Sequence, residues 1–553
     1  MQRPYPRVSG LRWLLLPVVV GITLRAAALG AQVLGGDELH AVRAAIGMPV
    51  SEILVTYRLS DHCIPLTAFY RLLMDAGMVL GELALRVPML ASGALLLIMA
   101  PAILAPRVGR KAAASFAWLL AISPMLFFYS RIVRSYMPLI VLGFAAVVAL
   151  ENWLSNRSWR YGASYVAVAS LAIYFHLAAI PFVLSQLVFT IGCSLSGERK
   201  ERPGLGSIAV LFGAVALAVA AFLVPAWSSL EPVLAAVQRR SAPGFETVVG
   251  VAKLQAGNAH PTLVIAFFAA ALAGLVRSLA NRSRLAVHTL ALALGQVTGL
   301  WLLAPLYAEY PLMLNRYLIL LLPWLLLWVA IGLAAPWWPG QRSFGSRVQR
   351  VAAYAFIALS FATGPLADAR LWSSPFAHHN DFLAFYRPRG ILPETDIPGF
   401  YRSLRDRDVA GPVLEYPFHT FWKFSRALRV YQEFHGREVL VSTPEIDIYD
   451  SRLGFRNIVR PETADLLASR ARYLAVHLDS GAELARIREA PGLPSAEAPL
   501  LNAVSADLES AARELTARLE RAWGAPFYSD DEIRVWDLDA VRSRDDESRR
   551  RSP

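Results

Sequence analysis

The sequence predicts a polytopic α-helical membrane protein that ends in a smaller α/β domain. Three observations support this fold class. Of the 553 residues, 56% are hydrophobic and only 17% are charged, whereas soluble domains carry about 25% charged residues. Apolar runs long enough to cross a bilayer recur from residue 11 to residue 366. From residue 367 onward charges become frequent, and no run is long enough to span a membrane.

A window of about 20 apolar residues divides the N-terminal part into about eleven candidate spans. They cover 11–34, 85–105, 112–128, 135–153, 161–175, 177–195, 206–226, 261–280, 285–305, 317–335 and 350–366. The segments 161–175 and 177–195 are short and adjacent, so they form either two spans or one broken helix.

Basic residues between the spans give the predicted topology. With the N-terminus in the cytoplasm, every short cytoplasmic loop carries arginine or lysine, as the positive-inside rule requires. These residues are Arg3, Arg7 and Arg12; Arg107, Arg110 and Lys111; Arg157 and Arg160; Arg199, Lys200 and Arg202; Arg282 and Arg284; and Arg342, Arg347 and Arg350. The agreement favours two spans over 161–195. It also explains the net charge of +12 without a nucleic-acid partner.

The longer loops then lie on the extracytoplasmic side of the membrane. Segment 35–84 mixes apolar and charged residues at helical spacing, which predicts amphipathic helices along the membrane surface. Ordinary loop helices packed on the bundle would give the same pattern. We group these helices with the spans in a membrane domain over 1–366.

The C-terminal region, 367–540, alternates strand-like and helical segments and is predicted to be an extracytoplasmic α/β domain. The strand-like segments are 411–417, 437–443, 471–479 and 532–538. The remaining residues, 541–553, are highly charged and are predicted to be a disordered tail.

Two carboxylates stand at the outer end of the first span, in the stretch "LGGDELHA". An ionisable side chain near a bilayer is costly unless it meets water or a partner. The pair Asp37 and Glu38 is therefore a candidate for a general base that faces a cleft. The simpler alternative is a pair of interfacial carboxylates that end a helix.

Arginine and tyrosine gather at the same outer side in "SPMLFFYSRIVRSYMPL", residues 123–139. The guanidinium groups of Arg131 and Arg134 match phosphate geometry and stay charged at any relevant pH. Tyr129 and Tyr136 accompany them as candidate substrate-binding residues. An aromatic and basic belt at the interface is the alternative interpretation.

Further candidate site residues lie near the outer ends of other spans. His62 precedes an amphipathic helix, and Arg316 and Tyr317 open the tenth span in "NRYLILLLP". His176 lies between the fifth and sixth spans, where an ordinary core histidine is the more common outcome. Together these residues offer one base and a cationic clamp. This set suits inverting transfer of a sugar from a lipid phosphate to an acceptor hydroxyl, with arginines stabilising the departing phosphate.

Several stretches resemble motifs of the GT-C class of integral-membrane glycosyltransferases. The resemblance is to the family 39 branch, which holds protein O-mannosyltransferases and the aminoarabinose transferase of lipid A. The similar stretches are "GGDELHA", "DHCIPLTAFYRLL", "GELALRVPMLASG", "SPMLFFYSRIVRSYM" and "NRYLILLLP", in the same order as in the family and spread over residues 11–335.

The resemblance implies a polyprenyl-phosphate-linked sugar as donor and a location in the bacterial inner membrane. It places Asp37 at the catalytic base position and Arg134 at the family's arginine. Arg131 stands where the family has glutamine. His62, His176, Arg316 and Tyr317 resemble further family positions.

Other partners and functions stay open at this stage. The acceptor is a glycan, a lipid or a protein, and membrane lipids surround the chain. No cofactor is predicted with certainty, and a divalent metal is left open. A transporter or flippase of polyprenyl-linked glycans is the main alternative, although such proteins favour repeated halves and polar groups near mid-membrane. A non-catalytic scaffold would leave the carboxylates and arginines unexplained.

Overall fold

The computed structural model divides into two compact units. Residues 1–27 and 48–371 form the membrane unit, and residues 28–47 and 372–553 form the C-terminal unit. The structure describes residues 11–27, 29, 38, 41–42, 44–45, 48–57, 63–78, 80, 82–196, 203–236, 243–303, 311–334, 343–367, 397–405, 411–417, 431, 435, 437, 439–440, 460–479 and 498–551. The division separates the segment around Asp37 and Glu38 from the predicted membrane domain.

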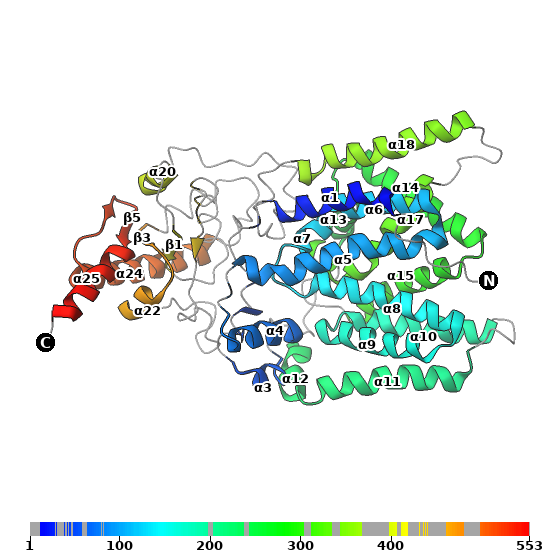
Figure 1. Ribbon diagram of the computed structural model, residues 1–553, viewed down its shortest axis with the longest axis horizontal. Coiled ribbons are helices and arrows are strands. Elements are labelled where there is room, and N and C mark those ends of the chain that lie inside the picture. The colour runs from blue at the N-terminus through cyan, green and yellow to red at the C-terminus, as the bar shows by residue number, and fades with distance from the viewer. Residues whose placement is uncertain are drawn as a thin grey trace. The chain divides into compact units, whose positions relative to one another are not determined.

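Helices of very different length build the membrane unit (Figure 1). They are α1 (Arg12–Ala26), α3 (Val50–Ile53), α4 (Ile64–Asp75), α5 (Glu82–Val108), α6 (Arg110–Ile122), α7 (Pro124–Tyr129), α8 (Tyr136–Asn156), α9 (Trp159–Phe175), α10 (Ala179–Ser196), α11 (Leu205–Leu223), α12 (Trp227–Ala236), α13 (Phe245–Ala256), α14 (Pro261–Ala280), α15 (Arg284–Leu303), α16 (Pro311–Leu318), η4 (Ile319–Leu321), α17 (Leu322–Ala334), α18 (Ser343–Ala362) and η5 (Pro365–Ala367). Among the described residues, seven helices are long and apolar enough to cross a membrane. The chain is thus a multi-pass membrane protein, and the count of eleven spans stays a prediction.

Several predicted spans are interrupted helices. The span 112–128 divides at Ser123, whose Oγ accepts from the backbone N–H of Leu126 at 3.5 Å and begins α7. The fifth and sixth spans are separate helices, α9 and α10, and extended backbone at His176 separates them. The tenth span begins as α16, tightens into the 3-10 turn η4 and continues as α17. These breaks place polar side chains at helix ends.

Helices α3 and α4 occupy part of the segment predicted to hold interfacial helices. Helix α4 buries Ile64, Leu66 and Tyr70 and exposes Phe69 and Leu72. An exposed apolar stripe on a short helix is typical of a surface-lying amphipathic helix. Its position at a membrane surface stays a prediction.

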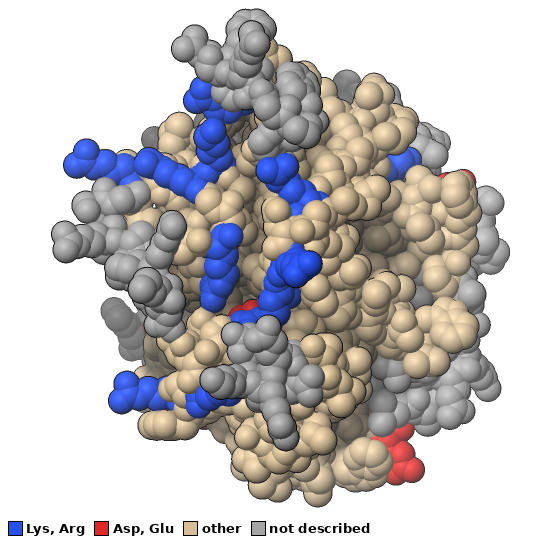
Figure 2. All heavy atoms as spheres, turned by 90° about the vertical axis from the view of Figure 1, so that its right-hand side faces the viewer, with Lys and Arg blue, Asp and Glu red and all other residues tan. Residues whose placement is uncertain are grey.

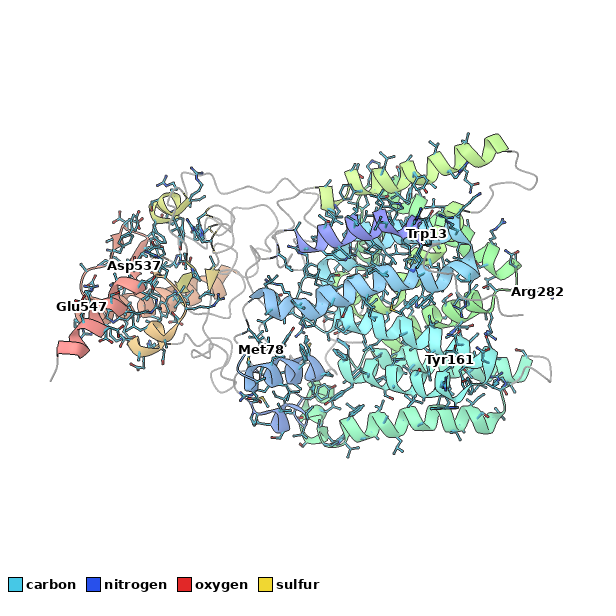
Figure 3. All side chains as sticks on the ribbon, in the orientation of Figure 1. Trp13, Met78, Tyr161, Arg282, Asp537 and Glu547 are labelled. Atoms are coloured by element: carbon cyan, nitrogen blue, oxygen red, sulfur yellow. The ribbon has the colours of Figure 1, made fainter. Side chains whose placement is uncertain are left out.

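The predicted cytoplasmic loops meet at one end of the membrane unit. Arg110 begins α6, Arg157 follows α8 and Arg282 precedes α15. Figure 3 places Tyr161 and Arg282 at this end and Met78 at the other. Figure 2 shows Lys and Arg side chains gathered over this face, with few carboxylates visible. This arrangement agrees with the positive-inside pattern of the sequence.

A five-stranded sheet organises the C-terminal unit, with strand order β2-β1-β3-β5-β4. Its strands are β1 (Val413–Tyr416), β2 (Val439–Leu440), β3 (Tyr473–His477), β4 (Tyr528–Ser529) and β5 (Ile533–Asp537), and its helices are α20 (Gly399–Arg405), α22 (Thr463–Ala468), α24 (Ala498–Trp523) and α25 (Leu538–Arg551). Strand β1 pairs in parallel with β2 and β3, whereas β5 pairs antiparallel with β3 and β4.

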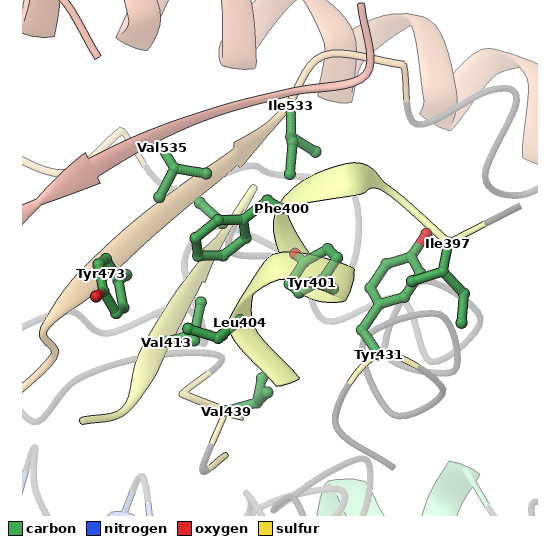
Figure 4. Close-up of a cluster of buried hydrophobic side chains, with 11 residues drawn as sticks. Ile397, Phe400, Tyr401, Leu404, Val413, Tyr431, Val439, Tyr473, Ile533 and Val535 are labelled. Carbon is green, nitrogen blue, oxygen red and sulfur yellow. The ribbon is translucent and has the colours of Figure 1, made fainter. Parts of the chain in front are cut away.

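Alternation along the strands builds the core of this unit. Val413, Tyr473 and Val535 lie in one buried cluster with Phe400 and Leu404 of α20 (Figure 4). Period-two alternation brings these strand residues onto one face of the sheet. The region is thus an α/β structure, and the four strand-like segments found in the sequence contain β1, β2, β3 and β5.

The charged C-terminal tail differs from its prediction. Residues 541–553 are predicted to be disordered, but helix α25 continues through Leu538–Arg551. Val541 is buried, and Arg542 donates to the backbone carbonyls of Leu467 and Ala471, each at 2.9 Å. Contacts with the rest of the unit therefore order a segment whose composition alone suggests disorder.

Candidate active site

Five predicted site residues lie in one cluster of the membrane unit, in which Tyr136 contacts Tyr129, His176 and Arg316 and His176 contacts Tyr317. We call Tyr129, Tyr136, His176, Arg316 and Tyr317 the tyrosine–arginine cluster. Ring centroids lie 4.8 Å apart for Tyr129 and Tyr136, and 5.5 Å apart for Tyr136 and His176. Arg316 Nη1 donates to the Tyr136 hydroxyl at 3.3 Å, and its guanidinium carbon lies 5.7 Å from the Tyr136 ring centroid.

Helix ends bring these side chains together. Tyr129 ends α7 and Tyr136 begins α8, so the short turn between them presents both rings. His176 occupies the break between α9 and α10. Arg316 and Tyr317 lie in the last turn of α16, and the centroid of the Tyr317 ring is 6.2 Å from that of His176. Segments far apart in the sequence therefore form one cluster.

Hydrogen bonding fixes the protonation pattern of His176. The backbone N–H of Ala178 donates to its Nδ1 at 3.1 Å. Since Nδ1 accepts, the neutral ring carries its proton on Nε2. The ring is buried among the tyrosines. The proton of the neutral His176 ring is thus on Nε2.

Gln296 of α15 connects the two chain breaks that carry the cluster. Its Nε2 donates to the carbonyl of Ala178 at 3.0 Å and to the carbonyl of Tyr317 at 2.8 Å. The side chain is fully buried, where the hydrogen bonds that its Nε2 donates are stronger than at the surface. One amide therefore fixes the backbone beside His176 and beside Arg316.

Gln255 and Asn315 form a second polar contact next to the cluster. The amide Nε2 of Gln255, in α13, donates to Oδ1 of Asn315, the neighbour of Arg316. Both side chains are buried. This contact joins α13 to α16, the helix that carries Arg316.

Arg131 caps α1, the helix that contains Arg25, and Arg25 caps α6. Arg131 Nη1 donates to the carbonyls of Arg25 and Ala27, at 2.8 and 2.6 Å, at the end of α1. Arg25 in turn donates to the carbonyls of Leu120 and Ala121, at 2.8 and 3.0 Å, at the end of α6. Terminal carbonyls need such donors. The geometry favours a structural role for Arg131 over the predicted contact with a donor phosphate.

The remaining predicted residues are placed as follows. Arg134 is buried in the α7–α8 turn, where its backbone N–H donates to the carbonyl of Ile132 at 2.8 Å. Glu38 is buried within the segment that groups with the C-terminal unit. Asp37 and His62 lie outside the described residues.

Nothing in the described part of the chain resembles a metal centre: no three His, Cys, Asp or Glu side chains lie close enough to hold an ion. The tyrosine–arginine cluster instead combines a fixed cation, hydroxyl groups and a histidine N–H. Such a set recognises an anion through charge and hydrogen bonds.

Two structural residues of the site were not predicted from the sequence. Arg25 and Gln296 both lie within apolar helices. A polar group inside a span is costly and therefore marks a functional or packing role. That signal is present in the sequence, but the partners of these residues are backbone carbonyls, which no sequence pattern identifies.

No family model and no curated protein matches the sequence. Among solved structures, the chain is similar to the apo oligosaccharyltransferase of Archaeoglobus fulgidus, with 13% identity, a TM-score of 0.47 and coverage of 88% of this chain and 72% of that chain. It is similar to the same archaeal enzyme, AglB, in complex with an inhibitory peptide and a dolichol-phosphate (13% identity, TM-score 0.46, 88% and 71% covered).

A third similar structure is ArnT from Cupriavidus metallidurans bound to undecaprenyl phosphate, with 16% identity, a TM-score of 0.42 and coverage of 78% of this chain and 86% of that chain. AglB and ArnT are both GT-C glycosyltransferases, the class that the sequence motifs resemble. At these identities and TM-scores the similarity identifies no substrate.

Proposed function

We propose that the chain is a glycosyltransferase that moves a sugar from a polyprenyl-phosphate donor to an acceptor hydroxyl. The observation that carries this proposal is the tyrosine–arginine cluster. In this cluster Tyr136 contacts both Arg316 and His176, and the three residues come from three separate helix ends. The same residues belong to stretches that resemble the motifs of GT-C enzymes.

The cluster offers the groups that a departing phosphate needs. Arg316 supplies a permanent positive charge, and the Tyr136 ring and hydroxyl hold its guanidinium in place. His176, whose Nδ1 accepts from the backbone N–H of Ala178, lies against the Tyr136 ring. Preorganised donors of this kind stabilise charge that develops on the leaving oxygen, because they need no reorganisation during reaction. Arg134, buried in the adjoining turn, is proposed to bind the donor phosphate.

The proposed reaction is a single displacement at the anomeric carbon. Asp37 removes the proton of the acceptor hydroxyl, whose oxygen then forms the new glycosidic bond. The bond between the anomeric carbon and the phosphate oxygen breaks, and the polyprenyl phosphate leaves with the electron pair. One base and no carboxylate nucleophile give inversion of configuration. Glu38 is the proposed orienting neighbour of Asp37.

The position of the cluster supports a reaction on the extracytoplasmic side. Tyr136 begins α8, and Asn156 ends it beside the basic residue Arg157. A helix of this length spans about 30 Å, so Tyr136 lies at the end of the bundle opposite the basic face. We place the C-terminal unit on the same side, because it follows the last predicted span.

Transfer activity tests the proposal directly. Purified protein in lipid vesicles is supplied with radiolabelled polyprenyl-phosphate sugars and with envelope glycans from a deletion strain. Asp37→Asn is expected to abolish transfer and to leave membrane insertion unchanged. Arg134→Ala is expected to weaken donor use more than Arg131→Ala. Full activity of Asp37→Asn would reject the base, and movement of the lipid-linked sugar from one leaflet to the other without transfer would favour a flippase.

A further inference from the structure

The C-terminal unit contains a buried polar cluster that the proposed reaction does not use. Tyr401 Oη donates to Glu415 Oε2 at 2.7 Å, and His477 Nε2 lies 2.7 Å from the same oxygen. All three side chains are fully buried. We call Tyr401, Glu415 and His477 the Glu415 cluster.

The Glu415 cluster lies at the point of the sheet where open α/β folds bind ligands. Glu415 belongs to β1 and His477 ends β3, and these strands are parallel neighbours. The chain leaves β1 toward β2 on one side, and it leaves β3 toward β5 and β4 on the other. Neighbouring parallel strands whose connections depart in opposite directions form a crevice at their carboxyl ends.

Burial makes Glu415 expensive as a purely structural residue. Its Oε2 accepts two hydrogen bonds, but its Oε1 accepts none from the described residues. A carboxylate offers about four lone-pair sites, and a buried acceptor without a donor is destabilising. A buried acceptor without a donor calls for an explanation, and at the carboxyl ends of such strands ligand binding is one.

Aromatic rings stack beside the two partners of the carboxylate, Tyr401 and His477. The Tyr401 and Tyr431 ring centroids lie 4.5 Å apart with planes 13° from parallel. His435 stacks on Tyr401 at 5.4 Å, and Tyr431 lies 6.1 Å from His477 with planes 9° apart. Figure 4 shows Tyr401 and Tyr431 beside each other at one end of the core. A sugar ring combines hydroxyl donors with an apolar C–H face, so it matches a carboxylate acceptor next to aromatic surfaces.

We infer that the Glu415 cluster is part of a second glycan-binding site, in which Glu415 Oε1 accepts a hydrogen bond from a hydroxyl of a neutral sugar. The carboxylate disfavours phosphate and other anions, so this site is distinct from the donor-phosphate site. The choice of a sugar over other hydroxyl ligands rests on the proposed function.

Binding of the intact protein to a printed array of neutral and acidic bacterial envelope oligosaccharides tests this inference. The wild type and Asp37→Asn are expected to bind the same neutral glycans. Glu415→Gln and Tyr401→Phe are expected to weaken that binding by about tenfold or more, the effect of one lost charge-assisted hydrogen bond. Glu514→Gln is the matched control, because Glu514 is an exposed carboxylate of the same unit.

Each result has a defined meaning. Binding of no glycan, binding of acidic glycans alone, or unchanged binding by folded Glu415→Gln would overturn the inference. Thermal unfolding of each variant shows whether it is folded, and Tyr401→Phe, which removes only a hydroxyl, serves if Glu415→Gln does not fold. If Glu415-dependent binding persists while the wild type transfers no sugar, the proposed function fails and the glycan site stands.

Discussion

At the scale of single residues, two arginines predicted for the same site, Arg131 and Arg316, have different surroundings and different predicted effects. Arg131 is buried and donates to the carbonyls that end α1. Arg316 is half-buried and lies over the ring of Tyr136. The first contact completes a helix end, whereas the second positions a charge beside polar groups that can reach a ligand. Residue type alone does not distinguish these roles.

This difference predicts opposite phenotypes for two matched substitutions. Arg131→Gln is expected to lower the free energy of unfolding by about 2 kcal/mol, because the α1 carbonyls lose a charged donor. Arg316→Gln is expected to reduce the transfer rate about 100-fold with little change in unfolding temperature. Thermal unfolding and single-turnover transfer measure the two effects. A large loss of transfer in Arg131→Gln and a loss of stability in Arg316→Gln would instead assign the phosphate contact to Arg131.

His435 makes the C-terminal unit sensitive to acid. Burial, reinforced by the nearby charge of Arg437, lowers the pKa of His435 to about 3, and the backbone N–H of Arg437 donates to its Nδ1 at 3.0 Å. In the unfolded chain the pKa of histidine is about 6.5. Between these values the unfolded state binds a proton that the folded state excludes, so stability falls as the pH decreases.

The expected loss from His435 is about 2 kcal/mol at pH 5 relative to pH 7.5. Thermal unfolding of the full chain at both pH values measures it, with His435→Phe as the control because phenylalanine keeps a ring and cannot titrate. The variant is expected to show the smaller decrease. An equal decrease in both proteins would assign the acid sensitivity to another group.

At the scale of helices, small residues decide how closely spans pack. Helices α14 and α17 approach at Gly274 and Gly332. A Cβ at Gly274 would overlap the carbonyl oxygen of Trp328, and one at Gly332 would overlap that of Ala270. Close approach of backbones through small residues is a common way for membrane helices to associate, since lipid supplies no hydrophobic drive between them.

Gly274→Val is therefore expected to separate α14 from α17 and to destabilise the membrane unit by about 1 to 3 kcal/mol. Gly213→Val in α11 is the matched control, because a Cβ there meets nothing within 4 Å. Thermal unfolding in detergent compares the two. Equal unfolding temperatures for both variants would show that the helices can separate without cost.

Helix interruptions, more than whole spans, position the candidate site. The breaks at Ser123, at His176 and after Leu318 each end a helix near the cluster. Gln296 then holds two of these breaks together. A buried amide that bonds to two carbonyls resists sliding of the helices, because each hydrogen bond has directional requirements.

At the scale of the whole molecule, charge distribution predicts orientation. The basic face of the membrane unit (Figure 2) is expected in the cytoplasm, and the C-terminal unit outside it. A phosphatase that is active only outside the cytoplasm, fused after residue 551, is expected to be active. The same fusion placed in the loop at Asn281 is expected to be inactive. Activity of the fusion at Asn281 alone would show that the predicted topology is inverted.

The membrane fold was predictable because apolar length and basic loops are local properties of the sequence. The α/β character of the C-terminal region was predictable because strand-like segments alternate with helical ones along its sequence. The helical tail was not, since contacts of Val541 and Arg542 with distant residues order it. The count of eleven spans stays a prediction, because helices such as α1, α6 and α9, which lie within predicted spans, are shorter than the roughly 20 residues that cross a bilayer.

The candidate site divides in the same way. The sequence by itself determined which residue types could serve: Tyr136, His176 and Arg316 stand at outer helix ends because polar groups avoid the bilayer interior. Only the tertiary structure decided that Tyr136 is the ring on which the others converge, that Arg131 caps a helix, and that Glu415 and His477 share one buried oxygen. Such contacts join positions more than a hundred residues apart in the first two cases, and packing of whole helices and strands fixes them.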